Sequence, residues 1–266
     1  MKKTSKLNFK KKKFDYKRLS LFATSFALIG VVTLTVTNAA APIKEDLKAY
    51  YPNTTDYQKN YLEGFNYASG NPFRSVFWFE KVDQWSFKAY NAAPENPDAR
   101  CNWDLLSWWD DGYLRYSQTH HECPGSIQND IYYDSPIVFL PRYWNGGPWK
   151  LTGESGAKYY ENGQLRCTGT NRWTAEIIGW EAVAPKVKGI HWRSTQITTW
   201  DGGDVPGKCY AGFVTNWQED NWLAKIPHPN GSLVKALKRS KGGNLDTPSG
   251  NWDVWYDKWV QLPVVN

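Results

Sequence analysis

The sequence predicts an all-β protein with a single antiparallel sheet, curved into a half-barrel or packed as a sandwich, and short helices near its ends. Two observations support this class. Residues 107–117 and 158–168 follow one template of two aromatics, two acidic or amide residues, Gly, and then Leu-Arg one residue later. Asp-Gly and Asn-Gly are typical turns of β-hairpins. Residues 167–177 also alternate between apolar or small residues and polar ones, as a half-buried strand does.

Residues 1–41 have the pattern of a secretory signal peptide. Nine Lys and Arg residues precede an uncharged, mostly apolar run over 19–36, and small residues at 38–41 offer a cleavage site. Cleavage after Ala39 or Ala40 is favoured. The alternative is an uncleaved anchor, since this run is near the shortest span of a bilayer. Either way the remainder is predicted to be exported, extracellular or at the cell surface, with membrane contact only through a retained segment.

The basic charge of the chain belongs to this leader. The nine basic residues and Asp15 precede residue 42, so the formal charge changes from +6 for the whole chain to −2 without them. The sequence therefore excludes nucleic acid as an expected partner.

Four cysteines lie in the predicted exported part, at positions 101, 123, 167 and 209. An even number in an oxidising compartment predicts two disulfides, and four cysteines allow three pairings. We favour Cys101–Cys123, which brackets the first hairpin, together with Cys167–Cys209. No two cysteines are close in sequence, so we expect no zinc or other metal site, and nothing indicates a cofactor.

The N-terminal part of the exported chain, residues 42–72, is predicted as a tether followed by a short helix. Thr55 and Gln58 have the spacing of a capping box, and apolar residues follow at helical intervals. Residues 73–266 are predicted as the β domain. Its first strands lie around 77–79 and 85–89, and a proline-containing loop covers 91–98.

The middle of the chain contains the two template hairpins and a connection between them. The first hairpin runs from about 103 to 120. Residues 132–150 are predicted as an extended crossover, because Pro136 and Pro141 argue against a central strand along the whole stretch. Further strands are expected over 190–200, 210–217 and 222–226, with turns at 201–204 and 218–221.

The C-terminal tail is predicted to form short helices over 233–238 and 252–259. In the second of these, Trp252, Trp255, Tyr256 and Trp259 have helical spacing, although a strand over 252–256 fits nearly as well. In either form, we expect this element to cover an open edge or end of the sheet.

Residues 132–200 carry a resemblance to a known family. Ser-Pro-Ile-Val-Phe-Leu-Pro at 135–141 precedes Gly-Gly-Pro-Trp at 146–149, a hairpin, and Ala-Val-Ala-Pro-Lys-Val-Lys-Gly-Ile at 182–190. This arrangement resembles bacterial exported proteins of the unclosed β-barrel, lipoprotein-carrier-like group. The resemblance implies a curved antiparallel sheet around an apolar cavity and a lipid-like ligand. The lipidation cysteine common in that group is missing here, which argues against a lipid tether.

Catalytic chemistry has weak support in the sequence, and no catalytic residue is assigned. Paired carboxylates could hydrolyse glycosidic bonds without a cofactor. The candidates are Glu176, on the polar face of a strand, and four acidic residues in predicted turns: Asp201, Asp204, Glu219 and Asp220. Acidic residues are common in turns for local hydrogen bonding, which is the competing interpretation.

Aromatic residues are the most distinctive excess, with 16 Trp and 16 Tyr. Neighbouring aromatics on a strand point to opposite faces, so some of them are expected outside the core. Such residues bind apolar groups or stack on sugars, although cross-strand aromatic pairs also stabilise sheets without any ligand. The candidate ligand-binding residues are Trp108, Trp109, Tyr159, Tyr160, Trp173 and Trp192. The leading expectation is non-enzymatic binding of an apolar or lipid-like ligand, and the alternatives are carbohydrate binding and glycoside hydrolysis.

Overall fold

The structure is a computed structural model that describes residues 44–51, 60–66, 70–93, 95–203, 211–227, 233–246 and 252–258. The chain divides into two units, Met1–Ile43 and Lys44–Asn266. The predicted leader at 1–41 therefore lies outside the described residues. Within these ranges, no helix is long and apolar enough to span a membrane.

The all-β prediction is confirmed, and the sheet curves until its pairings form a closed ring. Every neighbouring pair is antiparallel. Among the described residues, twelve strands form this barrel. Their order around it is β10 (Gln164–Ala184), β11 (Val187–Gly203), β12 (Val214–Pro227), β13 (Leu233–Asn244), β14 (Trp252–Lys258), β2 (Asn60–Asn66), β3 (Asn71–Lys81), β4 (Ser86–Ala92), β5 (Asn102–Trp108), β6 (Tyr113–His121), β7 (Asn129–Pro141) and β9 (Trp149–Glu161).

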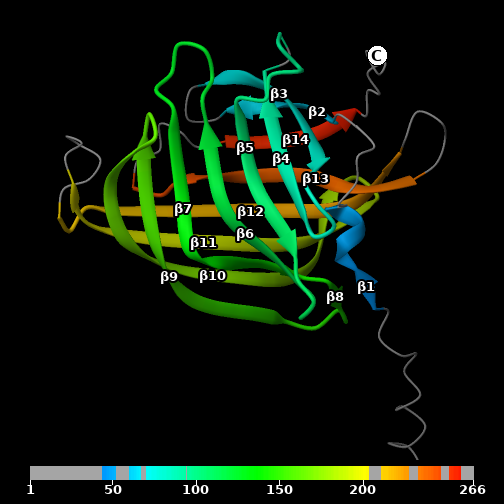
Figure 1. Cartoon of the computed structure of the whole chain (residues 1–266). Coiled ribbons are helices and arrows are strands. Elements are labelled where there is room, and N and C mark those ends of the chain that lie inside the picture. Colours follow the sequence, from blue (N-terminus) through cyan, green and yellow to red (C-terminus); the bar gives the residue numbers. More distant parts are fainter. Residues whose placement is uncertain are drawn as a thin grey trace, which may run out of the picture. The chain divides into compact units, whose positions relative to one another are not determined.

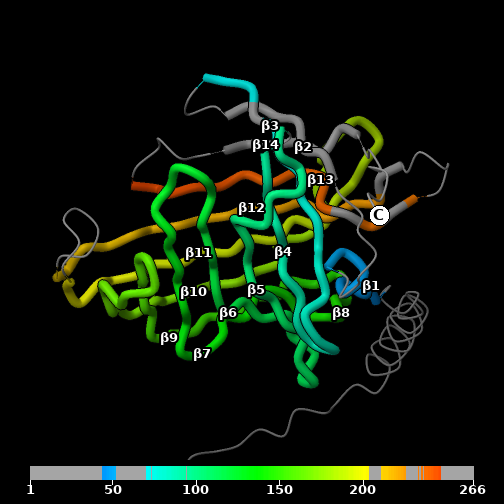
Figure 2. Tube along the Cα trace, turned by 45° about the horizontal axis from the view of Figure 1, so that its top comes forward, coloured from blue at the N-terminus to red at the C-terminus, as the bar shows by residue number. Residues whose placement is uncertain are grey.

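The barrel has two walls whose strands cross. In Figure 1, β4, β5, β6 and β7 run up and down across the front, and β10 to β13 run across behind them. The tube in Figure 2 shows the same arrangement from a tilted direction. Side chains that point inward from the two walls therefore meet in one interior.

One end of the barrel is closed by the N-terminal segment of this unit, which we call the plug. It consists of β1 (Glu45–Asp46), the short 3₁₀-helix η1 (Leu47–Tyr50) and Tyr51, and β1 pairs with β8 (Tyr143–Trp144). Leu47, Tyr50 and Tyr51 are buried in the main hydrophobic cluster. This cluster also contains Trp108, Trp192 and other residues from both walls, so the plug and the walls share one core.

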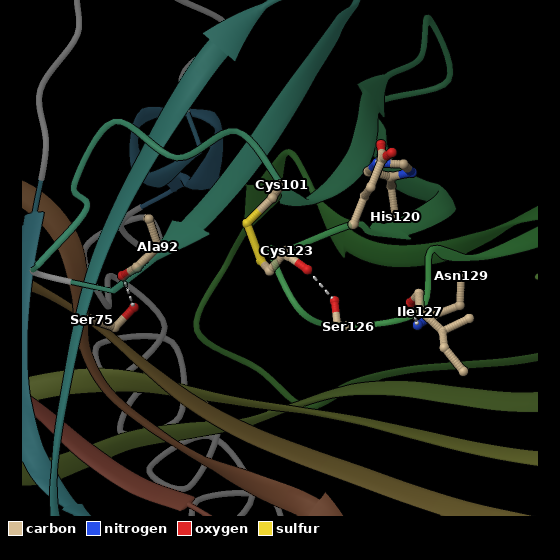
Figure 3. Close-up of a disulfide and its surroundings, with 9 residues drawn as sticks. Ser75, Ala92, Cys101, His120, Cys123, Ser126, Ile127 and Asn129 are labelled. Atoms are coloured by element: carbon tan, nitrogen blue, oxygen red, sulfur yellow. Dashed lines mark hydrogen bonds and ion pairs between the residues drawn. A yellow bond between two sulfur atoms is a disulfide. The ribbon is translucent and has the colours of Figure 1, made fainter. Parts of the chain in front are cut away.

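The end of the β5–β6 hairpin away from its turn carries a disulfide. Cys101 and Cys123 lie directly beyond the ends of the β5–β6 hairpin and are bonded, with an S–S distance of 2.03 Å (Figure 3). The prediction for this pair is confirmed. Ser126 Oγ donates to the carbonyl oxygen of Cys123 at 2.5 Å, which holds the following loop close to the bridge. Cys167 is also disulfide-bonded, but its predicted partner Cys209 lies outside the described residues.

Both template hairpins are present, as β5–β6 and β9–β10, and β7 lies between them in the ring. The positive φ values of Gly112, Asn162 and Gly163 provide the reversals that the turn residues predicted. The alternation over 167–177 is confirmed as well. Cys167, Asn171, Ala175 and Ile177 are buried on the inner face of β10, and Thr168 and Arg172 are exposed on the other.

The predicted terminal helices are wrong over the residues that the structure describes. Residues 60–66, 233–244 and 252–258 form β2, β13 and β14. Aromatic spacing in the tail fits both a helix and a strand, and the unpaired sides of β13 and β2 decide between them. β14 pairs with both of these strands and so closes the ring.

The crossover predicted over 132–150 contains a barrel strand, β7, in spite of its two prolines. β7 pairs with β9 only over Asn129–Tyr133, and its register with β6 shifts between Tyr132 and Ile137. Pro136 therefore sits in a bulge, beyond the end of the β9 pairing, and removes no ladder bond. The rule against proline in strands holds for two-sided pairing, which this stretch does not have.

The turn predicted over 218–221 is also wrong, because β12 passes straight through it with both neighbours paired. Its polar residues alternate between the two faces of the strand: Glu219 and Asn221 point into the barrel, and Asp220 points outward. Asp201 likewise lies at the end of β11 instead of in a separate turn, and Asp204 lies outside the described residues.

Candidate ligand-binding site

A group of polar side chains lies inside the barrel between its two ends, and we call it the polar belt. The register of the strands points its members inward from both walls. Its members are Asp104, Tyr116, Thr119, Tyr133, Asn171, Gln196, Thr198, Glu219 and Asn221. Polar groups inside a barrel need partners, so their hydrogen bonds show how the belt is organised.

Three sets of hydrogen bonds connect the belt. The hydroxyl of Thr119 donates to the Asp104 carboxylate and also bonds the hydroxyl of Tyr116. On another part of the wall, Tyr133 Oη donates to Gln196 Oε1 at 2.9 Å. Asn171 Nδ2 donates to the same oxygen at 3.1 Å and lies 3.2 Å from Thr198 Oγ1. In the third set, Asn221 Nδ2 donates to Glu219 Oε1 at 2.9 Å.

The two carboxyl groups of the belt come from opposite walls. Asp104 lies on β5 and Glu219 on β12, and these strands are six steps apart around the twelve-strand ring in either direction. Nevertheless the two groups interact electrostatically, and Glu219 also interacts with the Tyr116 hydroxyl beside Asp104. The two carboxyls therefore face a shared interior space.

Both carboxyl groups are hard to ionise. Burial raises the pKa of Asp104 to about 6, against the lowering effect of its hydrogen bonds with Thr119 and Tyr116. Burial also raises the pKa of Glu219 to about 7, and the nearby Asp104 adds to this rise. Near neutral pH, the belt therefore holds protons that solvent-exposed carboxylates would have lost.

Several buried polar atoms around the belt lack partners. They are Asn171 Oδ1, Asn221 Oδ1 and Ser194 Oγ, and none has a hydrogen bond within the part of the chain that the structure describes. All three residues are almost completely buried. An unpaired buried polar atom costs roughly 1–3 kcal/mol, so these atoms point to a bound polar group or ordered water.

An aromatic layer lies between the belt and the plug. Phe77 and Phe79 come from β3, Phe139 from β7 and Trp192 from β11, and all of them pack against the main core. Tyr51 of the plug contacts Phe79 and Phe139 at ring-centroid distances of 5.7 and 5.9 Å. Phe139 contacts Trp192 at 4.2 Å.

The aromatic layer is not fully enclosed. The three Phe residues are only partly buried although they face the interior. Eight strands already enclose an interior that side chains can fill, and twelve enclose a wider one. These inward-facing rings therefore keep surface that the surrounding side chains leave uncovered.

The six predicted ligand-binding residues divide between the two faces of the sheet. Trp108, Trp192 and Tyr159 are buried inside, and the Trp173 indole lies inside against Gly153. Trp108 Nε1 donates to the carbonyl oxygen of Tyr51 at 2.9 Å and so helps to hold the plug. In contrast, Trp109 is exposed in the β5–β6 turn, where Arg115 covers its ring, and Tyr160 contacts Tyr132 on the outer face.

The predicted catalytic carboxylates are also separated. Glu176 lies outside and pairs with Lys150 at 3.3 Å, and Asp220 lies outside beside His191 and Arg193. Among those that the structure describes, Glu219 is the one that faces the belt. Sequence reasoning missed Asp104, its counterpart on the other wall. The available signal was the alternation of Asp104, Leu106 and Trp108, which places a carboxyl on the apolar face of a strand.

Comparisons with protein-family models, with curated proteins and with solved structures find no match. In the described ranges, no group of three or more His, Cys, Asp or Glu residues could hold a metal ion. The functional conclusion therefore rests on the geometry of the interior.

Proposed function

We propose that this exported protein is a non-enzymatic binding protein that holds an amphipathic small molecule inside its barrel. The apolar part of the ligand packs on the aromatic layer, and its polar part occupies the belt. The observation that carries this proposal is the proximity of half-buried aromatic rings and unpaired buried polar atoms in one interior. Binding sites for small molecules combine an apolar lining with a few convergent polar groups in this way.

The compartment is consistent with this role. The Cys101–Cys123 disulfide fits an oxidising location, as expected outside the cytosol. An amphipathic molecule that crosses an aqueous extracellular or cell-surface space needs its apolar part shielded from water, and a barrel with a plugged end provides such shielding.

A glycan bound on outer aromatic residues is less well supported. The two outer rings among the candidate residues are engaged by other side chains, since Arg115 lies 4.4 Å from the Trp109 ring centroid and Tyr132 contacts Tyr160 at 5.3 Å. Platforms for sugars need free ring faces.

Glycoside hydrolysis is the second candidate, and one observation favours it. Asp104 and Glu219 are two carboxyls that face one interior, and Glu219, with a pKa of about 7, keeps a proton in part near neutral pH, as a general acid must. It ranks second because both pKa values are raised, whereas an acid and a nucleophile usually need environments that push their pKa values apart.

A matched pair of variants on β11 tests the proposed binding site. The full chain is expressed with its leader, and the exported protein is titrated with the neutral fluorescent probe N-phenyl-1-naphthylamine. Gln196 faces the belt and the adjacent Ile197 is exposed on the outer face. Gln196→Trp should fill the interior and weaken probe binding about tenfold or more, equivalent to ~1.4 kcal/mol.

Ile197→Trp is the control and should bind the probe as the wild type does. Circular dichroism and the unfolding midpoint establish that both variants are folded. Equal binding by the two variants, or no binding by the wild type, would contradict an interior site. Release of a labelled sugar from oligosaccharides by the wild type, lost in Glu219→Gln, would instead favour the hydrolase.

A further inference from the structure

We propose that the bound molecule carries a cationic head group, an amine or ammonium, held between Asp104 and Glu219 on opposite walls and surrounded by aromatic rings. This inference rests on the proposed function and names the chemical class of its ligand. Three independent features of the belt support it: the sign of its charged groups, the kind of polar atom left unpaired, and the rings around it.

The first feature is that the inner carboxyls have neutral partners only. Asp104 bonds Thr119, and Glu219 bonds Asn221 and interacts with Ser240. The described Lys and Arg side chains form no ion pair with either carboxyl. Outward carboxylates on β10 and β12 differ, since Asp220 pairs with Arg193 at 2.7 Å and Glu176 pairs with Lys150 at 3.3 Å. The interior therefore has negative charge and lacks a fixed counter-ion among these residues.

The second feature is that the unpaired amide atoms are acceptors. Asn171 and Asn221 use their Nδ2 atoms as donors within the belt, and their Oδ1 atoms are the ones left without a partner. A ligand that satisfies them must bring N–H or O–H donors. A primary ammonium group brings three donors and a positive charge, whereas a carboxylate brings acceptors only.

The third feature is the aromatic surroundings of the two carboxyls. Tyr116 and Tyr133 contact each other at a ring-centroid distance of 5.4 Å, and each interacts with Asp104. The Tyr51 hydroxyl at the plug interacts with Glu219. A cation beside such rings gains about 0.5–2 kcal/mol, more when it is shielded from water. An anionic ligand, in contrast, would add a third negative group to the interior.

Proton exchange follows from this arrangement. Without a ligand at pH 7, Asp104 is mostly ionised and Glu219 is about half protonated, because burial raises their pKa values to about 6 and about 7. When an ammonium group binds, each carboxyl that ionises breaks its O–H bond and releases the proton to the buffer, and the ligand nitrogen keeps its own protons. At pH 7, binding should therefore release less than one proton per ligand, mostly from Glu219.

The test compares ligands of equal chain length by isothermal titration calorimetry at pH 7, below the concentrations at which they form micelles. The probes are dodecylamine, dodecyltrimethylammonium, dodecanol and dodecanoate. Dodecylamine should bind about tenfold or more tightly than dodecanol, the equivalent of ~1.4 kcal/mol, and dodecanoate should bind most weakly. Dodecyltrimethylammonium carries the charge without N–H donors and should fall between dodecylamine and dodecanol.

The variant Asp104→Asn/Glu219→Gln keeps the shape of both side chains and removes their charge. In this variant, dodecylamine should bind no more than about threefold more tightly than dodecanol, compared with about tenfold in the wild type. Glu176→Gln removes an outward carboxylate and should keep the preference. Titrations in two buffers with different ionisation enthalpies should show proton release with the wild type and none with the double variant.

The outcomes separate this inference from the proposed function. Equal binding of dodecanol and dodecylamine, or tightest binding of dodecanoate, would overturn the cationic head group and leave the amphipathic binding site standing. If none of the four probes binds, both proposals fail. A preference for dodecylamine that survives in the double variant would also overturn the role of Asp104 and Glu219.

Discussion

Two adjacent residues of β12, Glu219 and Asp220, have the same charge and opposite environments. Glu219 faces the belt, where Asn221 and Ser240 are neutral partners, and its pKa is raised to about 7. Asp220 faces outward and accepts hydrogen bonds from Arg193 Nε at 2.7 Å and Gln218 Nε2 at 2.8 Å, and His191 Nε2 lies 2.7 Å away. Burial alone would raise the pKa of Asp220, but these partners outweigh it and the pKa is lowered.

The difference teaches how this barrel uses charge. On the outer face of β12, cationic side chains from the neighbouring strand β11 neutralise the buried Asp220 carboxylate. These ion pairs hold β11 against β12. On the inner face, Asp104 and Glu219 have no cationic partner among the described residues, which lowers the stability of the fold. This arrangement suits the proposed site, in which the ligand would supply the counter-charge. Under the proposed function, stabilising charges and ligand-binding charges would therefore lie on opposite faces of one sheet.

The largest expected effect comes from removing the outer carboxylate. Asp220→Ala removes the buried carboxylate that joins His191 to Arg193, and should lower the free energy of unfolding by about 3 kcal/mol. For a unit of this size, that corresponds to a fall in Tm of roughly 6–12 °C by calorimetry. Asp134→Ala is the control, because Asp134 is exposed and pairs only with exposed Lys158, and its Tm should barely change.

Two glycines on β9 compare inner and outer packing. A Cβ on Gly153 would lie 2.3 Å from Trp173 Cζ2 inside the barrel, whereas a Cβ on Gly156 would lie 2.3 Å from Asp134 Oδ2 outside it. The indole is held by packing and the carboxylate can rotate away. We expect Gly153→Ala to destabilise by about 2 kcal/mol in urea unfolding and Gly156→Ala by much less. Similar losses would show that the interior yields as easily as the surface.

Removing the inner charge should stabilise the protein. Because the folded-state pKa of Glu219 lies above its unfolded value, the group lowers stability as pH rises from about 4.5 to above 7. Glu219→Gln should therefore raise the free energy of unfolding by about 1–2 kcal/mol at pH 8, and the gain should vanish near pH 4.5. Chemical unfolding at both pH values measures it. A loss of stability at pH 8 would contradict the unfavourable burial of this charge.

The smallest expected effect concerns the outer histidine. Burial would lower the pKa of His191, but Asp220 and Glu181 outweigh burial and raise it. The stabilisation by protonated His191 is complete below its unfolded pKa and is lost as pH rises through the folded value. His191→Gln should therefore cost about 1 kcal/mol near pH 6 and less near pH 9, as measured by denaturant midpoints. An equal cost at both pH values would show that the charge of His191 is unimportant.

Local patterns were sufficient to predict much of the sheet. The alternation along β10 identified its inner face, and the Asp-Gly and Asn-Gly turns identified both hairpins. The position of Cys101 and Cys123 around the first hairpin identified their bond. Each of these features depends on residues that are close in sequence, so a local sequence pattern is enough to predict it.

The polar belt could not be predicted in the same way. Asp104 and Glu219 come together only because the ring closes and brings β5 opposite β12. The run from Gln218 to Asn221 resembles a turn until the outer partners of Asp220 and the inner partners of Glu219 are known. Aromatic spacing in the tail fits a helix until β14 is required between β13 and β2.

The separation of β7 from β9 beyond Tyr133 has a consequence for self-association. A closed ring offers few strand edges on which a second molecule could add a strand. This stretch of β7 pairs on one side only, as β9 does over 149–156. Pro136 and Pro141 remove backbone donors there. The two prolines thus protect the β7 edge against intermolecular β-pairing.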